Sequence, residues 1–198
     1  NIKSETVLRE RLFPKLNKQV GRQAIRTVQH IPGENRDILK TYLRQINKAR
    51  RSIYIENPYM TCHKIQDALV TAAKRGVDVH VILPGQNDHA FSHWAARSKY
   101  PKMLDAGVKL YEYPGFNHGK VMVTDGRFVT IGSSNLDDVA LYHIYETNLN
   151  VHNKEFAADV MKRVFKKDIA MSKPMQKSNI TTTQKVMGRF WNLFAHFI

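Results

Sequence analysis

The sequence predicts an α/β fold, an α-β-α sandwich in which helices cover both faces of a mixed β-sheet. Two observations support this prediction. Strand-like and helix-like segments alternate in the first half of the chain, and strand-like segments follow one another directly in the middle. With 198 residues and 42% apolar content, the chain is long and apolar enough to bury the core of one domain.

The first half of the chain alternates between strand and helix patterns. Segment 24–31 alternates as a strand does, and after a break at Pro32 and Gly33, segment 37–51 places its apolar residues at helical spacing. A β-branched and aromatic strand, an alanine-rich helix that stops at Gly76, and a buried strand then follow over 52–57, 64–75 and 77–84. This order is the β-α-β alternation of an α/β sheet.

Strands dominate the second half. A helix over 89–104 stops before Gly107, and a strand over 108–113 follows it. We expect the strands 119–125 and 127–133 to form a hairpin, because Asp-Gly at 125–126 favours a tight turn. A further strand over 146–152 and a further helix over 155–167 complete the predicted fold.

Composition divides the chain into four parts. Residues 1–22 form a basic amphipathic lead-in, and 23–168 hold the predicted sheet and helices. Residues 169–184 lack aromatic and acidic side chains, which is typical of a linker. Residues 185–198 form an amphipathic, aromatic-rich and basic C-terminal helix. Such a helix suits a membrane interface, and packing on the surface of the domain is an equally good explanation.

Charge and cysteine content limit the classes of partner and site. The chain has 31 Lys and Arg against 17 Asp and Glu, a formal net charge of +14, which favours anionic partners such as phospholipid surfaces or nucleic acid. The lone cysteine, Cys62, excludes an intrachain disulfide and a cysteine-based zinc site. Histidines are scattered without metal-ligand spacing, so we assign no metal and no cofactor.

The sequence also bears on targeting. No run of about eighteen apolar residues is present, and no segment resembles a signal peptide. Because the chain begins with Asn1 rather than Met, we expect a fragment, a processed product or an excised domain.

His118 and Lys120 are the candidate catalytic pair. One residue separates them, so in an extended strand both side chains lie on the same face and reach one phosphate. An imidazole nucleophile and an ammonium group that neutralises phosphate oxygens supply two requirements of phosphodiester cleavage without a metal. The predicted hairpin returns Gly132, Ser133 and Asn135 beside this pair.

These residues resemble a known signature. The pattern of His118, Lys120 and Asp125 followed by Gly-Ser-any-Asn ending at Asn135 resembles the signature of the phospholipase D superfamily. The segments SIYIENPYM, AAKRGVDVHVILP, LDAGVKLYEY and ETNLNV are similar to the second half of bacterial cardiolipin synthases, so the resemblance covers roughly 26–168. It implies a phospholipase D-like catalytic half at 23–168, one half of a pseudo-two-fold active-site pair.

The resemblance also implies roles for the site residues. His118 would be the nucleophile and Lys120 the phosphate clamp. Ser133 and Asn135 would contact the phosphate or the histidine, and Glu146 would orient the imidazole. Asp125 belongs to the signature and to the candidate site, with a role more structural than catalytic. The chain departs from many cardiolipin synthases at Val139, Ala140 and Ile144.

The implied reaction needs two such motifs, because one histidine attacks phosphorus while another protonates the leaving alcohol. His152, Lys154 and Asp159 repeat the spacing, but no Gly-Ser-any-Asn follows them. We expect Asn153 to cap the next helix, with its charged neighbours in a solvated first turn. The second motif would come from an identical chain or, as the synthase-like register favours, from a missing N-terminal half.

The resemblance implies a phosphatidyltransferase or phospholipase, cardiolipin synthase-like, that acts through a phosphohistidine on His118. The alternative is a metal-independent endonuclease of the same superfamily that works as a homodimer, which the positive charge favours. A third possibility is a non-catalytic partner that lends one motif to another chain. The expected partners are an anionic phospholipid substrate, a membrane surface and a second motif-bearing half, with nucleic acid less favoured. We expect peripheral membrane association, at a bacterial inner membrane.

Overall fold

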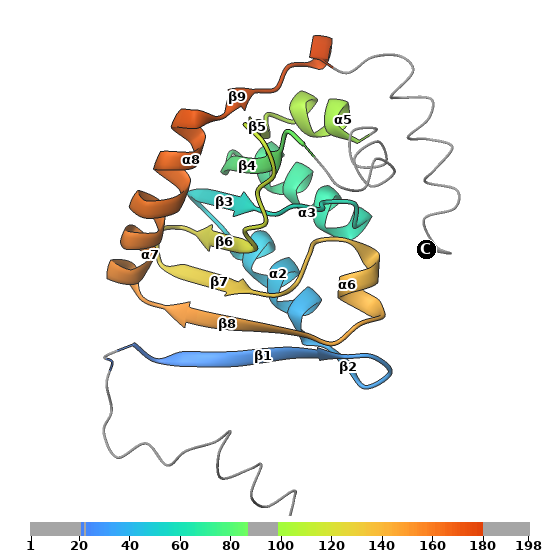
Figure 1. Cartoon of the computed structure of the whole chain (residues 1–198), viewed down its shortest axis with the longest axis vertical. Helices are drawn as coiled ribbons and strands as arrows, with labels where there is room; N and C mark the ends of the chain where they lie inside the picture. Colours follow the sequence, from blue (N-terminus) through green and yellow to red (C-terminus); the bar gives the residue numbers. More distant parts are fainter. Residues whose placement is uncertain (1–20, 22, 87–98, 180–198) are drawn as a thin grey trace, which may run out of the picture.

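The computed structural model describes residues 21, 23–86 and 99–179, and these form one mixed sheet covered by helices on both faces. The strands, in chain order, are β1 (Ile25–Ile31), β2 (Asn35–Arg36), β3 (Ser52–Glu56), β4 (Asp78–Pro84), β5 (Lys109–Tyr113), β6 (Val121–Thr124), β7 (Phe128–Gly132), β8 (Glu146–His152) and β9 (Lys173–Pro174). They form a nine-stranded sheet in the order β2-β1-β8-β7-β6-β3-β4-β5-β9 (Figure 1).

The pairing within the sheet explains why it is mixed. β3 pairs with β4 and β4 with β5 in parallel, because helices connect these strands. All the other pairs are antiparallel, including the β6–β7 hairpin predicted from the sequence. Asp125 and Gly126 adopt φ values of 53° and 62° in its turn, a region that Gly and Asp tolerate better than most residues.

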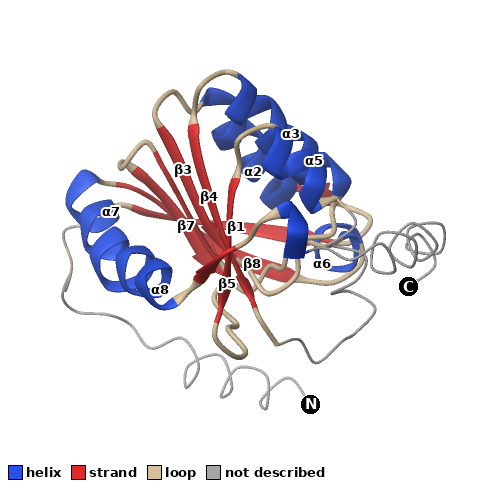
Figure 2. Ribbon diagram, turned by 90° about the horizontal axis from the view of Figure 1, so that it is seen from above, coloured by secondary structure: helices blue, strands red, loops and turns tan. Residues whose placement is uncertain are grey.

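The helices form two layers. They are α2 (Asp37–Lys48), α3 (His63–Lys74), α5 (Tyr100–Asp105), α6 (Asp138–Tyr142), α7 (Lys154–Val160), a π-helical turn (Met161–Phe165) and α8 (Lys166–Met171), with a 3₁₀ turn at Lys177–Asn179. Figure 2 shows α2, α3 and α5 on one face of the sheet and α7 and α8 on the other. The predicted α-β-α sandwich is confirmed.

Each face of the sheet has its own apolar core. In β6, Met122 belongs to the core under α2 and α3, whereas Val121 and Val123 belong to the core under α7 and α8. Tyr42 of α2 and Phe165 of the π-helical turn are among the largest fully buried side chains of the two cores. In the described part of the chain, no helix has both the length and the apolar content needed to cross a bilayer.

The predicted boundary at residue 168 is too early. The last helical segment runs on to Met171, and β9 then pairs with the edge strand β5. The Met175 amide donates to the Leu110 carbonyl oxygen at 2.9 Å, and the Met175 side chain is buried in the core. The first part of the predicted linker 169–184 therefore belongs to the fold. A two-residue edge strand has no periodic pattern, which is why composition missed it.

Other predictions are outside the described residues. These are the lead-in over 1–20, the C-terminal helix over 185–198 and most of the predicted helix over 89–104, of which α5 is the observed end. The short elements β2 and α6 were not predicted.

Candidate active site

The candidate active site lies at the edge of the sheet where β6 and β8 begin and β3 and β7 end, on the right in Figure 1. His118 and Lys120 come just before β6, and Ser133 comes just after β7. The Gly132 amide donates to the Lys120 carbonyl oxygen at 3.2 Å, and Glu146 begins the adjacent β8. The antiparallel order of these strands therefore brings four predicted residues to one edge.

His118 and Lys120 differ in exposure. The His118 side chain is exposed, and its ring stacks on Phe116 with the centroids 5.4 Å apart. Lys120 is buried, and its Nζ donates to the His118 carbonyl oxygen at 3.2 Å. Burial lowers the pKa of Lys120, while the negative charges of Glu146 and Asp137 act in the opposite direction. An accessible imidazole thus stands beside a partly desolvated cation.

Ser133 and Glu146 form a hydrogen-bonded pair. The Ser133 hydroxyl donates to the carboxylate of Glu146, which is 8% exposed, and accepts from the Thr147 amide at 3.0 Å. In the described chain no hydrogen bond joins Glu146 to His118. Glu146 interacts electrostatically with Lys120 instead. The structure therefore places Ser133 as the partner that fixes Glu146.

Asn135 is half-buried in the loop between β7 and α6. Its side chain is hydrogen-bonded with the Asp137 carboxyl group, and its Oδ1 is buried without a hydrogen-bond partner in the described chain. Asp137 also caps α6, accepting from the Ala140 amide at 2.7 Å. Burial raises the pKa of Asp137, although these hydrogen bonds act against it. Sequence reasoning missed Asp137, whose only signal is its position just before a short helix.

Asp125 does not belong to this site. It lies at the other end of β6, five residues from Lys120, a separation of roughly 16 Å in a strand. Its carboxylate accepts from the backbone amides of Arg50, Arg51 and Ser52 at 2.8–3.1 Å. Burial acts to raise its pKa, but these amides hold the pKa of Asp125 below its usual value. The structure thus places Asp125 away from His118 and Lys120, with contacts of the structural kind expected for it.

Asn57 comes directly after β3 and is hydrogen-bonded to the loop between β7 and α6. Asn57 is buried, donates to the Ser134 carbonyl oxygen at 3.3 Å and accepts from the Leu136 amide at 3.0 Å. It thereby ties β3 to the loop that holds Ser133 and Asn135. The sequence signal for this role is the polar pair Glu-Asn at the end of an apolar strand.

Glu56 lies against the segment that holds the candidate pair, His118 and Lys120. A side chain at Gly119 would collide with the Glu56 carboxyl group in its present position, so Gly119 allows Glu56 to lie close to the backbone between His118 and Lys120. Asn117 accepts from the Gly119 amide at 2.9 Å and is hydrogen-bonded with Glu56. Burial and the neighbouring carboxyl group of Asp168 raise the pKa of Glu56 to about 7.

The second occurrence of the spacing spans the end of one strand and the start of a helix. His152 ends β8, and Lys154 begins α7. The Asn153 side chain accepts from the Phe156 amide at 2.8 Å, so the predicted cap is confirmed. Among the residues that the structure describes, no group of three or more His, Cys, Asp or Glu could hold a metal ion.

Comparison with known proteins decides the family. A family model described as "Cardiolipin synthase, PLD-like domain" matches residues 42–169. The chain belongs to this family. A cardiolipin synthase from Staphylococcus aureus strain N315 is 33% identical to this PLD-like chain over 172 residues, which cover 85% of the chain and 34% of the relative. An uncharacterized protein from Streptococcus mutans is 37% identical over 170 residues, covering 82% and 35%. This PLD-like chain therefore spans about a third of the length of these relatives.

Solved structures share the fold. Nuc from Salmonella typhimurium, a phospholipase D family member, has a TM-score of 0.68 at 22% identity, covering 78% of this chain and 99% of Nuc. Phosphatidylserine synthase from Haemophilus influenzae has a TM-score of 0.64 at 11% identity, covering 90% of this chain and 47% of the synthase. The same PLD-like fold thus forms nearly all of one neighbour and about half of another.

Proposed function

We propose that this PLD-like chain is one half of the active site of a phosphatidyltransferase or phospholipase that cleaves the phosphodiester of an anionic phospholipid. The observation that supports it most directly is the exposed His118 beside the buried Lys120. Membership of a family described by the name of cardiolipin synthase favours a lipid substrate.

The proposed first step is attack by His118. A lone pair on an imidazole nitrogen forms a bond to phosphorus, and the bond from phosphorus to the leaving alcohol oxygen breaks with its electron pair. Lys120 neutralises the non-bridging oxygens, whose charge grows in the transition state. The leaving oxygen takes a proton from an acid of a second motif.

The second step reverses these movements. The oxygen of a lipid alcohol or of a water molecule forms a bond to phosphorus and loses its proton to the same group of the second motif, which is now a base. The bond from phosphorus to the imidazole nitrogen breaks with its electron pair, and His118 is released unchanged. Glu146 and Ser133 would keep Lys120 in place, because Glu146 is near the Lys120 ammonium group and Ser133 holds Glu146. The side-chain amide group of Asn135 would contact the phosphate.

The second motif must come from another copy of the chain or from a further segment. Four apolar side chains near the edge of the site are exposed by 37–77%: Phe116, Val139, Ile144 and Tyr145. Apolar groups of this kind suit contact with a second half or with lipid chains. Peripheral association with a bacterial inner membrane fits a phospholipid substrate and completes this proposal.

An endonuclease is the second candidate. The net charge of +14 favours it, because DNA is an anionic partner. A nuclease would use the same phosphohistidine chemistry on DNA.

One experiment separates the two candidates. We would incubate the protein, both as this chain alone and together with any further segment that supplies a second motif, with labelled phosphatidylglycerol vesicles and, separately, with DNA, and search for acid-labile phosphate on His118. We expect lipid turnover that His118→Asn and Lys120→Gln each reduce by about a thousandfold or more. Lys154→Gln is the matched control, because it removes an exposed lysine from the second occurrence of the spacing and should leave turnover unchanged. Cleavage of DNA without any lipid turnover would refute the lipid proposal.

A further inference from the structure

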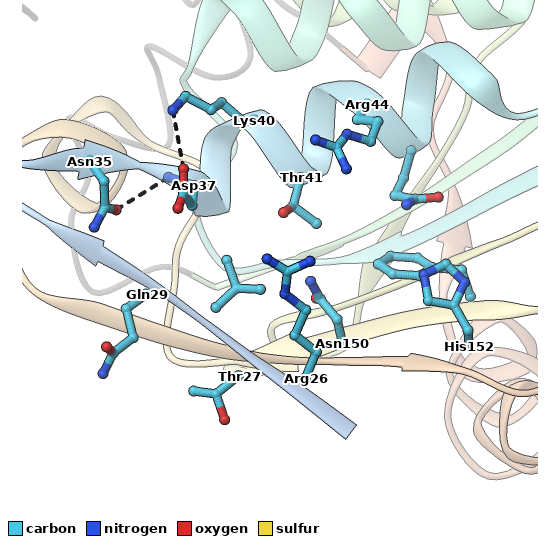
Figure 3. A pocket seen from close by; sticks show the side chains of 13 residues that line it. Arg26, Thr27, Gln29, Asn35, Asp37, Lys40, Thr41, Arg44, Asn150 and His152 are labelled. Atoms are coloured by element: carbon cyan, nitrogen blue, oxygen red, sulfur yellow. Dashed lines mark hydrogen bonds and ion pairs between the residues drawn. The ribbon is translucent and has the colours of Figure 1, made fainter. Parts of the chain in front are cut away.

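A polar pocket lies between β1 and α2, away from the candidate active site (Figure 3). Its volume is about 480 Å³. Residues from β1, β2, α2, β7 and β8 surround it, among them Arg26, Lys40, Thr41, Arg44, Asn150 and His152. The function proposed for the candidate active site does not use these residues.

The pocket has an excess of positive charge. Arg26 reaches it from β1, and Lys40 and Arg44 reach it from α2. The carboxylate of Asp37 is the sole acidic group among the lining residues, and it pairs with the Lys40 ammonium group at 3.1 Å. In the described part of the chain, neither arginine has an ion pair. Figure 3 shows both guanidinium groups turned toward the same space. Two like charges that share a hollow are stabilised by an anion.

Neutral polar groups complete the lining. Asn150 is 7% exposed, and its Oδ1 is buried without a hydrogen-bond partner in the described chain. A buried amide oxygen without a donor is unfavourable by itself and indicates a ligand that supplies one. The Thr41 hydroxyl lies on the opposite side of the pocket (Figure 3). The site therefore offers cations for an anion and an acceptor for a hydroxyl group.

The pocket is separate from the candidate active site. Asn150 lies four residues along β8 from Glu146, and His152 lies six residues along it. At the rise of a strand, these separations are roughly 13 and 20 Å. The His152 ring is tilted against the Phe128 ring, with the centroids 4.7 Å apart, and both residues line the pocket.

We propose that this pocket binds a phosphate group that bears a hydroxyl, with Arg26 and Arg44 as the anion ligands and Asn150 accepting from the hydroxyl. Inorganic phosphate and the glycerol phosphate headgroup of an anionic phospholipid share this chemistry. Arginine suits it because its planar group donates two parallel hydrogen bonds to phosphate oxygens.

The test uses the whole chain with Lys120→Gln, so that the candidate active site contributes little to anion binding. Calorimetry measures the affinity for inorganic phosphate, and flotation measures binding to phosphatidylglycerol vesicles against phosphatidylcholine vesicles. The pocket variant combines Arg26→Gln and Arg44→Gln. The matched control combines Lys74→Gln and Lys166→Gln, which removes the same charge from exposed positions on α3 and α8.

We expect the pocket variant to lose at least about tenfold in affinity for one of the two ligands, while the control stays within about twofold. A loss confined to vesicles identifies a lipid headgroup, and a loss with inorganic phosphate alone identifies the free anion. Asn150→Leu should reproduce the loss in either case, because it removes the acceptor without changing charge. Equal affinities of the pocket variant and the control for both ligands would overturn the proposal.

Discussion

Burial and nearby charges act in opposite directions on the pKa of Lys120, which lies beside His118. Burial lowers the pKa of Lys120, and the carboxyl groups of Glu146 and Asp137 oppose that shift. A lysine in this state is only partly compensated, so a phosphate dianion or phosphodiester at its ammonium group gains more than it would in open water. We therefore expect the Lys120 ammonium group to bind an anion without first changing its position.

Glu56 gives a pH-dependent prediction at the scale of a single residue. Its Oε2 is buried with no donor in the described chain, and Asp168 lies beside it, so a proton on Glu56 stabilises the contact. The pKa is raised from 4.5 to about 7, which means that the folded state binds this proton more tightly than the unfolded state. The free energy of unfolding should therefore fall by roughly 1–2 kcal/mol as pH rises from about 5 to 8.

Glu56→Gln removes this titration and keeps the shape of the side chain. Urea unfolding at pH 5, 6, 7 and 8 should show that the variant loses less stability over this interval than the unsubstituted chain. Asp168→Asn, which removes the neighbouring charge, should flatten the curve as well. A constant difference between Glu56→Gln and the unsubstituted chain at every pH would contradict the assignment.

Sequence reasoning found most of the site because strand geometry has a period of two. Alternation placed His118 and Lys120 on one face, and the hairpin placed Ser133 beside them. Asp125 was grouped with them because of the signature, although the predicted strand 119–125 has Asp125 at its far end, roughly 16 Å from Lys120. Glu56 and Asp137 were missed because their importance comes from burial against segments distant in the sequence.

At the scale of elements, the Asp125 carboxylate fastens the β6–β7 hairpin to the start of β3 through three backbone amides. Asp125→Asn leaves one oxygen to accept these bonds and removes the charge, so we expect a loss of about 1–2 kcal/mol in the free energy of unfolding at pH 7. The turnover of folded enzyme should not change.

The pH dependence of this effect has a definite sign. Because the pKa of Asp125 is lowered, its contribution is present above the unfolded value and is lost as pH falls through the folded value. The difference between Asp125→Asn and the unsubstituted chain should therefore shrink in acid. Glu34→Gln removes an exposed carboxylate and is the control in the same denaturation series. A loss of turnover with unchanged stability would return Asp125 to the catalytic residues.

Elements with a strong period were predictable, and short ones were not. The alternating strands and the long helices α2 and α3 follow from apolar spacing, which a window of several residues records. β2, β9 and α6 have two, two and five residues, too few to show a period. Their positions depend on pairing with β1 and β5 and on the cap at Asp137.

At the scale of the whole molecule, the fold presents one His-Lys pair at an open edge of the sheet. The same fold makes up 99% of Nuc and 47% of a phosphatidylserine synthase chain. A unit of this size therefore occurs both alone and as part of a longer chain. Completing the proposed reaction requires a second acid, so the source of that acid decides whether the chain acts by itself.

If two copies of the chain form the complete site, His118→Asn should act on the unsubstituted protein in a mixture. Each mixed pair would contain one intact histidine and lack either the nucleophile or the acid. With an excess of the variant, the specific lipid turnover of the unsubstituted chain should fall roughly in proportion to its fraction in the mixture, because random pairing leaves few intact pairs. The same excess of Lys154→Gln, whose site is complete, should not inhibit. Turnover that is independent of added His118→Asn, from a species with the mass of one chain in sedimentation, would show that no second copy is needed.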